Sequence, residues 1–142
     1  GMDTCVDYKA ADFEQCLAQA VPDGVDIYFD NVGVPILDAA LRLMNECGKV
    51  IVCGAINQYQ NMQEIKGPRE YLKIPERKLS MLGFTCFHYA ERYPEGVAAL
   101  RQLLQTGQLK YFEETAEGLG QFSAQLNKLF TGDHRGKLIV SL

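Results

Sequence analysis

The chain has 142 residues, of which 47% are hydrophobic, so it is long enough to bury one ordinary core. Its 14 basic and 18 acidic residues give a net charge of −4, and the basic residues are scattered, which excludes the cationic patch of a nucleic-acid-binding protein. The apolar runs are too short to span a bilayer, the first residues of the sequence lack a basic region followed by an apolar one, and the five cysteines lack the spacing of a zinc site. We therefore expect an unexported, cytoplasmic protein with reduced thiols, no metal and no membrane partner.

The first 24 residues predict a short strand and a helix. Residues 4–9 form an extended run, and the helix follows Asp12, which has Gln15 at the spacing of a capping box. Pro22-Asp23-Gly24 ends this helix. Apolar residues at helical spacing predict its buried face, namely Phe13, Cys16, Leu17, Ala20 and Val21.

A strand, a helix and a second strand come next. Residues 25–32 and 49–55 are apolar runs rich in β-branched and aromatic side chains, as in strands that are covered on both faces. The helix between them begins with Pro35 in its first turn and ends at Gly48. Units of this kind build parallel sheets, so we expect the α/β class. The buried stripe of the helix consists of Ile36, Leu37, Ala40, Leu41 and Met44.

The rest of the chain continues the alternation of strands and helices. Residues 57–75 are a polar loop with one helical turn near Tyr71, and a loop of this length in a compact domain is usually functional. The expected elements after it are a strand at 80–87, a helix from Pro94 to Gly107, a strand at 109–113, a helix around 122–130 and a last strand at 136–142. The side chains expected to point inward are Val97, Leu100, Leu104, Phe122, Leu126, Leu129 and Phe130.

Polar and small residues follow two of the predicted strands, where ligands bind in open α/β sheets. Asn31 lies in Asp30-Asn31-Val32-Gly33, and Gly33 would let backbone approach a ligand closely. An Asx-type turn into the next helix explains Asn31 equally well. The second strand ends in the small-residue turn Cys53-Gly54-Ala55-Ile56, followed by Tyr59, which can alternatively be one amphipathic side chain with a packed ring and a wet hydroxyl.

The stretch from Gly24 to Tyr59 resembles the zinc-independent branch of the medium-chain dehydrogenase/reductases, the NADPH-dependent alkenal and prostaglandin reductases. This resemblance implies a partial Rossmann-like nucleotide-binding domain, doubly wound and mostly parallel, that lacks its first strands and the Gly-x-Gly-x-x-Gly turn. We therefore expect the C-terminal portion of a longer enzyme. Residues 1–108 would belong to the NADP-binding domain, and residues 109–142 would be a strand-helix-strand tail that in full-length relatives returns to the substrate domain.

The same resemblance implies an NADP(H) site at these strand ends. Tyr8 and Lys9 would lie near the adenosine 2′-phosphate, which favours NADPH over NADH, although a solvated surface pair is the simpler explanation of the two residues. Asn31 would line the dinucleotide site. The backbone of Cys53, Gly54, Ala55 and Ile56 would run along the nicotinamide half of the cofactor.

Further residues are assigned by the resemblance alone. Tyr59 would lie near the nicotinamide ribose and the reacting carbon, as a candidate catalytic hydroxyl. Phe84, Thr85 and Cys86 would meet the nicotinamide carboxamide, although a core strand needs such residues in any case. His134 stands where the family commonly has asparagine, and it can donate one hydrogen bond in place of the amide.

The implied activity of the full enzyme is reduction of the carbon–carbon double bond of α,β-unsaturated ketones and aldehydes with NADPH. The chain itself is expected to be inactive alone, and the alternative is a non-catalytic nucleotide-binding or dimerisation module. In the usual strand order 3-2-1-4-5-6 the chain would lack strands one and two, which leaves the edge of strand four bare. An open strand edge is an association site, so we expect either self-association through this edge or a rearranged tail that covers it. Residues 80–87 are the competing edge for a homodimer.

Overall fold

The computed structural model describes residues 2–59 and 61–142. The chain divides into two compact units, Gly1–Thr85 and Cys86–Leu142, called here the N-terminal unit and the C-terminal unit. In the part of the chain that the structure describes, no helix combines the length and the apolar character needed to cross a membrane. The predicted boundary between residues 108 and 109 separates an NADP-binding part from a tail that returns to a substrate domain in full-length relatives. This division stays a prediction.

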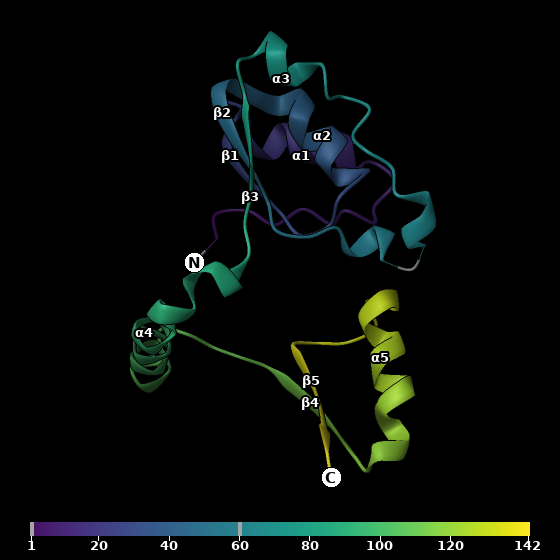
Figure 1. The fold of residues 1–142 in the computed structure, drawn as a ribbon, viewed down its shortest axis with the longest axis vertical. Helices are drawn as coiled ribbons and strands as arrows, with labels where there is room; N and C mark the ends of the chain where they lie inside the picture. The colour runs from purple at the N-terminus through teal and green to yellow at the C-terminus, as the bar shows by residue number, and fades with distance from the viewer. Residues whose placement is uncertain (1, 60) are drawn as a thin grey trace. The chain divides into compact units, whose positions relative to one another are not determined.

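The N-terminal unit is built on three parallel strands, β1 (Val25–Asp30), β2 (Met44–Val52) and β3 (Ser80–Gly83), in the order β1-β2-β3 (Figure 1). Tyr28 of β1 pairs with Val50 of β2, and Val50 pairs with Met81 of β3. The helices of this unit are α1 (Phe13–Ala20), α2 (Ile36–Leu43) and the short α3 (Lys73–Glu76). The predicted α/β class with a parallel sheet is therefore confirmed, and both β1 and β3 are edge strands.

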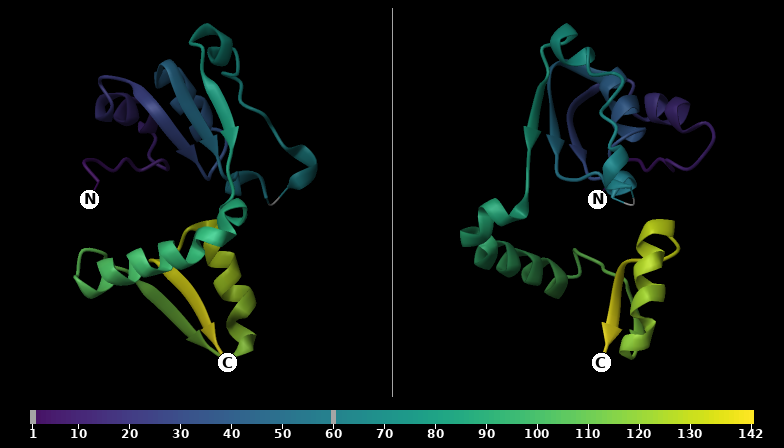
Figure 2. Two further views of the ribbon diagram at one scale, coloured as in Figure 1. Left: turned by 60° about the vertical axis from the view of Figure 1, so that its left-hand side comes forward. Right: turned by 45° about the vertical axis from the view of Figure 1, so that its right-hand side comes forward.

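The core of this unit lies between α2 and one face of the sheet. Its buried residues are Leu37, Leu41, Met44, Val50 and Leu79, and Tyr28 packs against them. The apolar stripe predicted for the helix is confirmed at Leu37, Ala40, Leu41 and Met44. On the opposite face Ile27 is 67% exposed and Phe29 is 48% exposed. The prediction of two covered faces is thus wrong within this unit, because α1 and α2 lie on the same side of the sheet (Figure 2).

The first helix follows its predicted pattern in part. The five residues predicted for its inner face, Phe13, Cys16, Leu17, Ala20 and Val21, are all half-buried. The predicted capping box is absent, since the side chain of Asp12 caps no backbone N–H; hydrogen bonding to Asp12 instead raises the pKa of the Cys16 thiol. Residues 4–9 form no strand, because a strand needs a hydrogen-bonded neighbour and none lies beside this segment among the described residues.

Two boundaries differ from the sequence prediction. Helix α2 ends at Leu43 rather than at Gly48, and the chain then turns through Cys47, whose φ of 62° is left-handed. Continuous pairing of β2 with β1 resumes at Lys49, which is where the strand was predicted to begin. Strand β3 ends at Gly83, four residues before the predicted end at residue 87.

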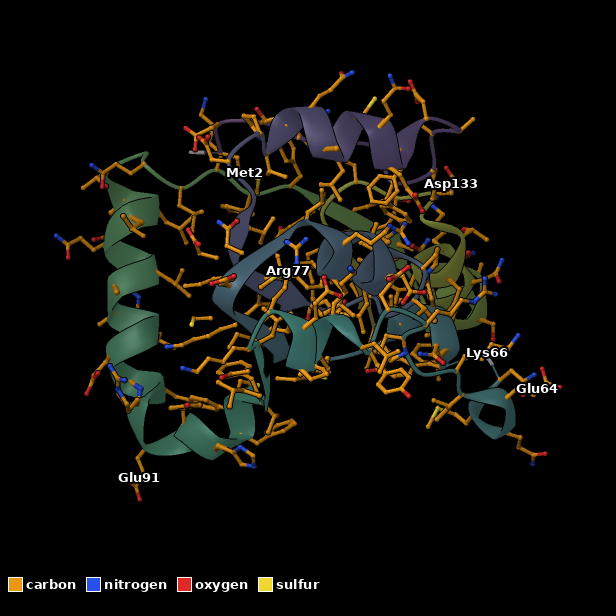
Figure 3. The ribbon with its side chains drawn as sticks, turned by 90° about the horizontal axis from the view of Figure 1, so that it is seen from above. Met2, Glu64, Lys66, Arg77, Glu91 and Asp133 are labelled. Carbon is orange, nitrogen blue, oxygen red and sulfur yellow. The ribbon has the colours of Figure 1, made fainter. Side chains whose placement is uncertain are left out.

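Polar contacts tether the predicted loop at residues 57–75 to α2. It contains the short 3-10 turns Ile56–Gln58 and Met62–Glu64, and α3 begins two residues after Tyr71, where a helical turn was predicted. Arg42 Nη1 lies 3.1 Å from Glu70 Oε1, and the Glu70 N–H donates to Asp38 Oδ1 at 3.2 Å. The Arg77 guanidinium donates to the Met44 carbonyl near the middle of the unit, whereas Glu64 and Lys66 lie at its periphery (Figure 3).

The C-terminal unit pairs two parallel strands, β4 (Glu113–Glu117) and β5 (Lys137–Ser141), with α5 (Phe122–Thr131) alongside (Figure 1). The terminal strand β5 therefore has a partner strand, β4, within the chain. Helix α4 (Tyr93–Gln105) precedes the strands. No residue of 86–142 is buried, and the side chains expected to point inward from α4 are half exposed, with Val97 and Leu100 at 53% and Leu104 at 40%.

Candidate functional site

The carboxyl ends of β1, β2 and β3 meet at one edge of the sheet, since the three strands are parallel (Figure 2). From this edge the chain continues as residues 31–33, 53–59 and 84–85. The predicted site residues that the structure brings to this edge are Asn31, Cys53, Gly54, Ala55, Ile56, Tyr59, Phe84 and Thr85. We refer to these three segments as the strand-end edge.

Asp30, the last residue of β1, holds the strand-end edge together. Its side chain is buried, and its Oδ1 accepts hydrogen bonds from the Val32 N–H and the Gly33 N–H, both at 2.9 Å, and from the Tyr28 hydroxyl at 3.0 Å. Its main-chain carbonyl accepts from the N–H groups of Cys53 at 2.8 Å and Gly54 at 3.1 Å. Five hydrogen bonds therefore converge on one residue and join the turns that follow β1 and β2.

Tyr28 contributes a neutral donor to this arrangement. Burial, followed by the charge of Asp30 and the hydrogen bond to it, raises the pKa of the Tyr28 phenol well above its ordinary value. The phenol therefore keeps its proton throughout the physiological range and donates it to Asp30.

The alternative interpretation of Asn31 as an Asx-type turn proves right in kind but one residue off. The turn is made by the side chain of Asp30, while the Asn31 carbonyl accepts the Ile56 N–H at 3.1 Å and Asn31 is one of the residues that line a cavity. The Asn31 amide is thus available for a ligand.

The backbone donors of the segment after β2 are all used inside the protein. The N–H groups of Cys53 and Gly54 donate to Asp30, that of Ile56 to Asn31, and that of Asn57 to the Val32 carbonyl at 3.3 Å. The Ala55 N–H donates to the hydroxyl oxygen of Tyr59 at 3.1 Å. Backbone contact with a ligand along residues 53–57 would therefore be made by carbonyl oxygens, which accept but do not donate.

Close packing of the two turns requires small residues. Gly33 has a φ of +83°, and a Cβ there would lie 3.0 Å from the Cβ of Ala55. A Cβ on Gly54 would lie 2.8 Å from the Tyr59 hydroxyl oxygen. Both glycines thus serve the approach of the chain to itself, and Tyr59, half exposed, is folded back over its own turn with its hydroxyl proton still free to be donated.

A cavity of about 720 Å³ adjoins this edge at the open side of β1. Ligand sites commonly enclose roughly 300–1,000 Å³. Tyr8 and Asn31, two of the predicted cofactor residues, both line it, together with residues of α1, β1 and α2, while Lys9 does not. Among the described residues that line it, Asp3 is the one formally charged side chain, so this cavity offers no cation to a phosphate.

Phe84 and Thr85 follow β3 and are half-buried. The Phe84 N–H donates to the Val52 carbonyl at 2.9 Å, and its ring meets that of Phe29 edge to face with centroids 5.5 Å apart. Phe84 therefore contributes to packing across the sheet, which was the simpler explanation of this segment.

Cys86 and His134 belong to the C-terminal unit. Cys86 is exposed, and hydrogen bonding to it raises the pKa of Tyr93. His134 Nδ1 lies 3.1 Å from the Lys128 carbonyl, in the loop between α5 and β5. The strand-end edge of the N-terminal unit is thus described without these two residues, and their role in a cofactor site stays a prediction.

Sequence reasoning missed Asp30 and Tyr28. The available signal was a carboxylate at the end of an apolar strand, two residues after a tyrosine and three before a glycine, because alternation in a strand puts residues 28 and 30 on the same face. Among the described residues, no three His, Cys, Asp or Glu side chains lie close enough to hold a metal ion.

A parallel sheet whose strand ends carry small residues, an amide and a tyrosine defines the class of Rossmann-like nucleotide-binding folds. The chain belongs to the zinc-binding dehydrogenase family, whose model matches residues 1–140. The expected resemblance to medium-chain reductases is thereby confirmed.

Individual relatives agree with this assignment. The chain is 40% identical to YfmJ of Bacillus subtilis (strain 168), provisionally named an NADP-dependent oxidoreductase, over 99% of its own length and 42% of the relative. It is 36% identical to the 2-alkenal reductase (NADP(+)-dependent) of Nicotiana tabacum, over 99% of the chain and 41% of the relative. The crystal structure of CurA in complex with NADPH from Vibrio vulnificus matches with a TM-score of 0.87 and 35% identity, over 99% of this chain and 43% of that one. The chain thus spans about two-fifths of the length of these relatives.

Proposed function

We propose that this chain supplies the strand-end part of the NADPH site of an oxidoreductase that reduces the carbon–carbon double bond of α,β-unsaturated ketones and aldehydes. The observation that carries the proposal is the strand-end edge, where eight of the predicted site residues lie on three adjoining segments. The 2-alkenal reductase among the relatives and the NADPH complex of CurA support the substrate class and the cofactor.

The main-chain groups of residues 53–57 that remain for a ligand are acceptors. The N–H groups of residues 53–57 are used internally, and the Asp30 carboxylate lies beneath the turn. Carbonyl oxygens and the Asn31 amide oxygen suit donors such as a carboxamide NH₂ or ribose hydroxyls, and a buried carboxylate disfavours a phosphate. The residues present therefore fit the nicotinamide-ribose half of NADPH, while Tyr8 and Lys9 are proposed for the 2′-phosphate.

When bound, the cofactor supplies a hydride for the β-carbon of the enone. The role proposed for this chain is to orient the cofactor and the substrate and to hold a proton for the substrate. The Tyr59 hydroxyl accepts from the Ala55 N–H and so keeps its own proton for the oxygen of the substrate. A hydroxyl that accepts one hydrogen bond donates a second more strongly, which suits stabilisation of a developing enolate.

Matched variants test the two halves of the site. Lys9→Gln should abolish a preference for NADPH over NADH, because it removes the charge that faces the extra phosphate, while Lys110→Gln in the C-terminal unit should leave the preference intact. Asn31→Ala should weaken the binding of NADPH and of NADH equally. A Lys9→Gln variant that keeps the full NADPH preference would remove Lys9 from the site.

Catalysis by the chain alone is a separate question. We propose that it shows no turnover of an enone with NADPH, and a rate above the uncatalysed background in an absorbance assay would contradict this. Tyr59→Phe, installed at the matching position of a full-length relative, is expected to lower kcat with little change in the affinity for NADPH. Unchanged turnover would withdraw Tyr59 from the reaction.

The open strand edges favour a second candidate, a module that dimerises. Among the described residues, β1 and β3 each have a strand neighbour on one side only, and Ile27 and Phe29 of β1 are exposed. Strand-to-strand pairing of two copies would satisfy these backbone groups. Light scattering over a wide concentration range tests this candidate, and a strictly monomeric chain would count against it.

A further inference from the structure

We propose that Asp30 is the positioning residue of the cofactor site: its buried carboxylate fixes the turn that presents Asn31 and ties this turn to the segment that carries Tyr59. The proposal rests on the proposed NADPH site, since positioning has meaning only for a ligand that the edge receives. Its structural half, the fixing of the turn, can be tested without any ligand.

The geometry gives Asp30 this role because its two acceptor groups serve different segments. Oδ1 takes the N–H groups of Val32 and Gly33, so the peptide units on both sides of Val32 are held in one orientation. The main-chain carbonyl takes the N–H groups of Cys53 and Gly54, the first residues after β2. Removing the side chain should free the first turn and leave the second attachment in place.

Burial makes this arrangement rigid. Asp30 is 1% exposed, and hydrogen bonds to a charged acceptor are roughly twice as strong as those between neutral groups. The Tyr28 hydroxyl donates to the same Oδ1 and fixes the carboxylate from the side of the core. Without these hydrogen bonds the turn at Asn31 could shift by small amounts, because Asn31 itself is exposed and not held by packing.

The second carboxylate oxygen tells which substitution should preserve the function. Oδ2 is buried and has no hydrogen-bond partner among the described residues. Asp30→Asn keeps Oδ1 as an acceptor and exchanges an unpartnered acceptor for an unpartnered donor. The three hydrogen bonds to Oδ1 survive in this variant, whereas Asp30→Ala loses all three.

The test compares Asp30→Ala, Asp30→Asn and Tyr28→Phe in the full chain, with Asp38→Asn as the matched control. Asp38 is also a buried aspartate, 8% exposed, that accepts one backbone hydrogen bond, but it lies on α2 and holds Glu70 rather than the strand-end edge. The first readout is the amide resonances and hydrogen exchange of Val32 and Gly33. The second is the NADPH dissociation constant from nicotinamide fluorescence.

We expect Asp30→Ala to shift the amide resonances of Val32 and Gly33 and to abolish their protection from hydrogen exchange. The affinity for NADPH should fall about tenfold or more. Asp30→Asn should stay within about threefold of the unmodified chain, and Tyr28→Phe should fall between the two. Asp38→Asn should perturb the Glu70 amide and leave the NADPH affinity unchanged. Rescue by asparagine separates positioning by the side chain from a merely structural loss.

Two results overturn the proposal: a folded Asp30→Ala variant with unchanged Val32 and Gly33 amides, or one with changed amides and unchanged NADPH affinity. If Asp30→Ala does not fold, Asp30→Ser takes its place; its shorter hydroxyl can hold the turn only weakly, so both effects should keep their direction and be smaller. If the unmodified chain binds no NADPH, the proposed function fails, and the cofactor half of the proposal falls with it. The amide readout still decides whether Asp30 fixes the turn.

Discussion

The two units of this molecule use the same ingredients and reach different degrees of burial. Each pairs parallel strands and sets at least one amphipathic helix against them. In the N-terminal unit Leu41, Met44 and Val50 are fully buried, whereas no residue of 86–142 is buried. An apolar helical face becomes a core only when a second layer closes over it. The comparison predicts that structural stability, like the candidate site, resides in the N-terminal unit.

Hydrogen exchange should show the largest difference between the units. Amides of the central strand β2, including Val50 and Ile51, should exchange about 100-fold or more slowly than those of β4 and β5, because the former open only with the core. Mass spectrometry of peptides from both units measures this. Equal protection of β2 and β5 would break the comparison.

Cavity-forming substitutions should follow the same division. Leu41→Ala, at a residue with 0% exposure, should lower the free energy of unfolding by about 2–5 kcal/mol. Leu126→Ala on α5, where the leucine is 41% exposed, should cost less than about 1 kcal/mol. Urea denaturation compares the two variants, and similar losses would mean that α5 is covered in solution.

Glycine substitutions should act with opposite signs. Gly33→Ala should destabilise the N-terminal unit by about 1–2 kcal/mol, because a side chain there is strained at a φ of +83° and meets the Ala55 Cβ at 3.0 Å. Gly96→Ala, in α4 with open space around it, should stabilise that helix by about 0.5–1 kcal/mol. Thermal melts of both variants test this, and a stabilising Gly33→Ala would contradict the close packing of the strand-end turns.

Lowering the pH should produce the smallest loss of stability, and this loss should occur in both units. A hydrogen bond from Lys73 lowers the pKa of Glu76, and one from Lys128 lowers the pKa of Glu114. A lowered folded-state pKa means that the stabilisation is complete above the ordinary glutamate range of about 4.3 and is lost as the pH falls through the folded-state pKa. Glu76→Gln and Glu114→Gln should each remove one part of this pH-dependent loss. High salt should reduce both contributions, because the two Lys–Glu pairs lie near solvent. If neither substitution changes the loss of stability with falling pH in an acid titration, these two ion pairs do not contribute to acid stability.

Much of the N-terminal unit was predictable because its signals are local and strong. The apolar stripe of α2 and the parallel strands follow from periodicity and β-branched runs, and the glycine turn after β2 marks the strand end. The end of α2 at Leu43 was not, because Asn45, Glu46 and Cys47 are compatible with a helix, and the left-handed turn at Cys47 that leads into the paired part of β2 is set by tertiary context. Residues 4–9 have the composition of a strand but no strand to pair with in the part of the chain that the structure describes, which composition cannot reveal.

The candidate site was predictable in its exposed residues and not in its support. Asn31 and Tyr59 stand out as polar groups after apolar strands. Asp30 does not stand out, because its importance lies in five hydrogen bonds from residues near and far, two of them from the turn after β2. Likewise, the exposure of α4 could not be read from its amphipathic pattern, which indicates a face suited to burial and not the presence of a covering layer.

The most direct test of the central claim is a titration of the unmodified chain with NADPH, followed by nicotinamide fluorescence, with NADH in parallel. We predict a saturable enhancement with a lower dissociation constant for NADPH than for NADH, because the strand-end edge is proposed to receive the nicotinamide-ribose half and Lys9 is proposed to face the additional phosphate. No saturable change up to millimolar cofactor would contradict it, and the strand-end edge would then be a structural feature of the fold without a ligand of its own.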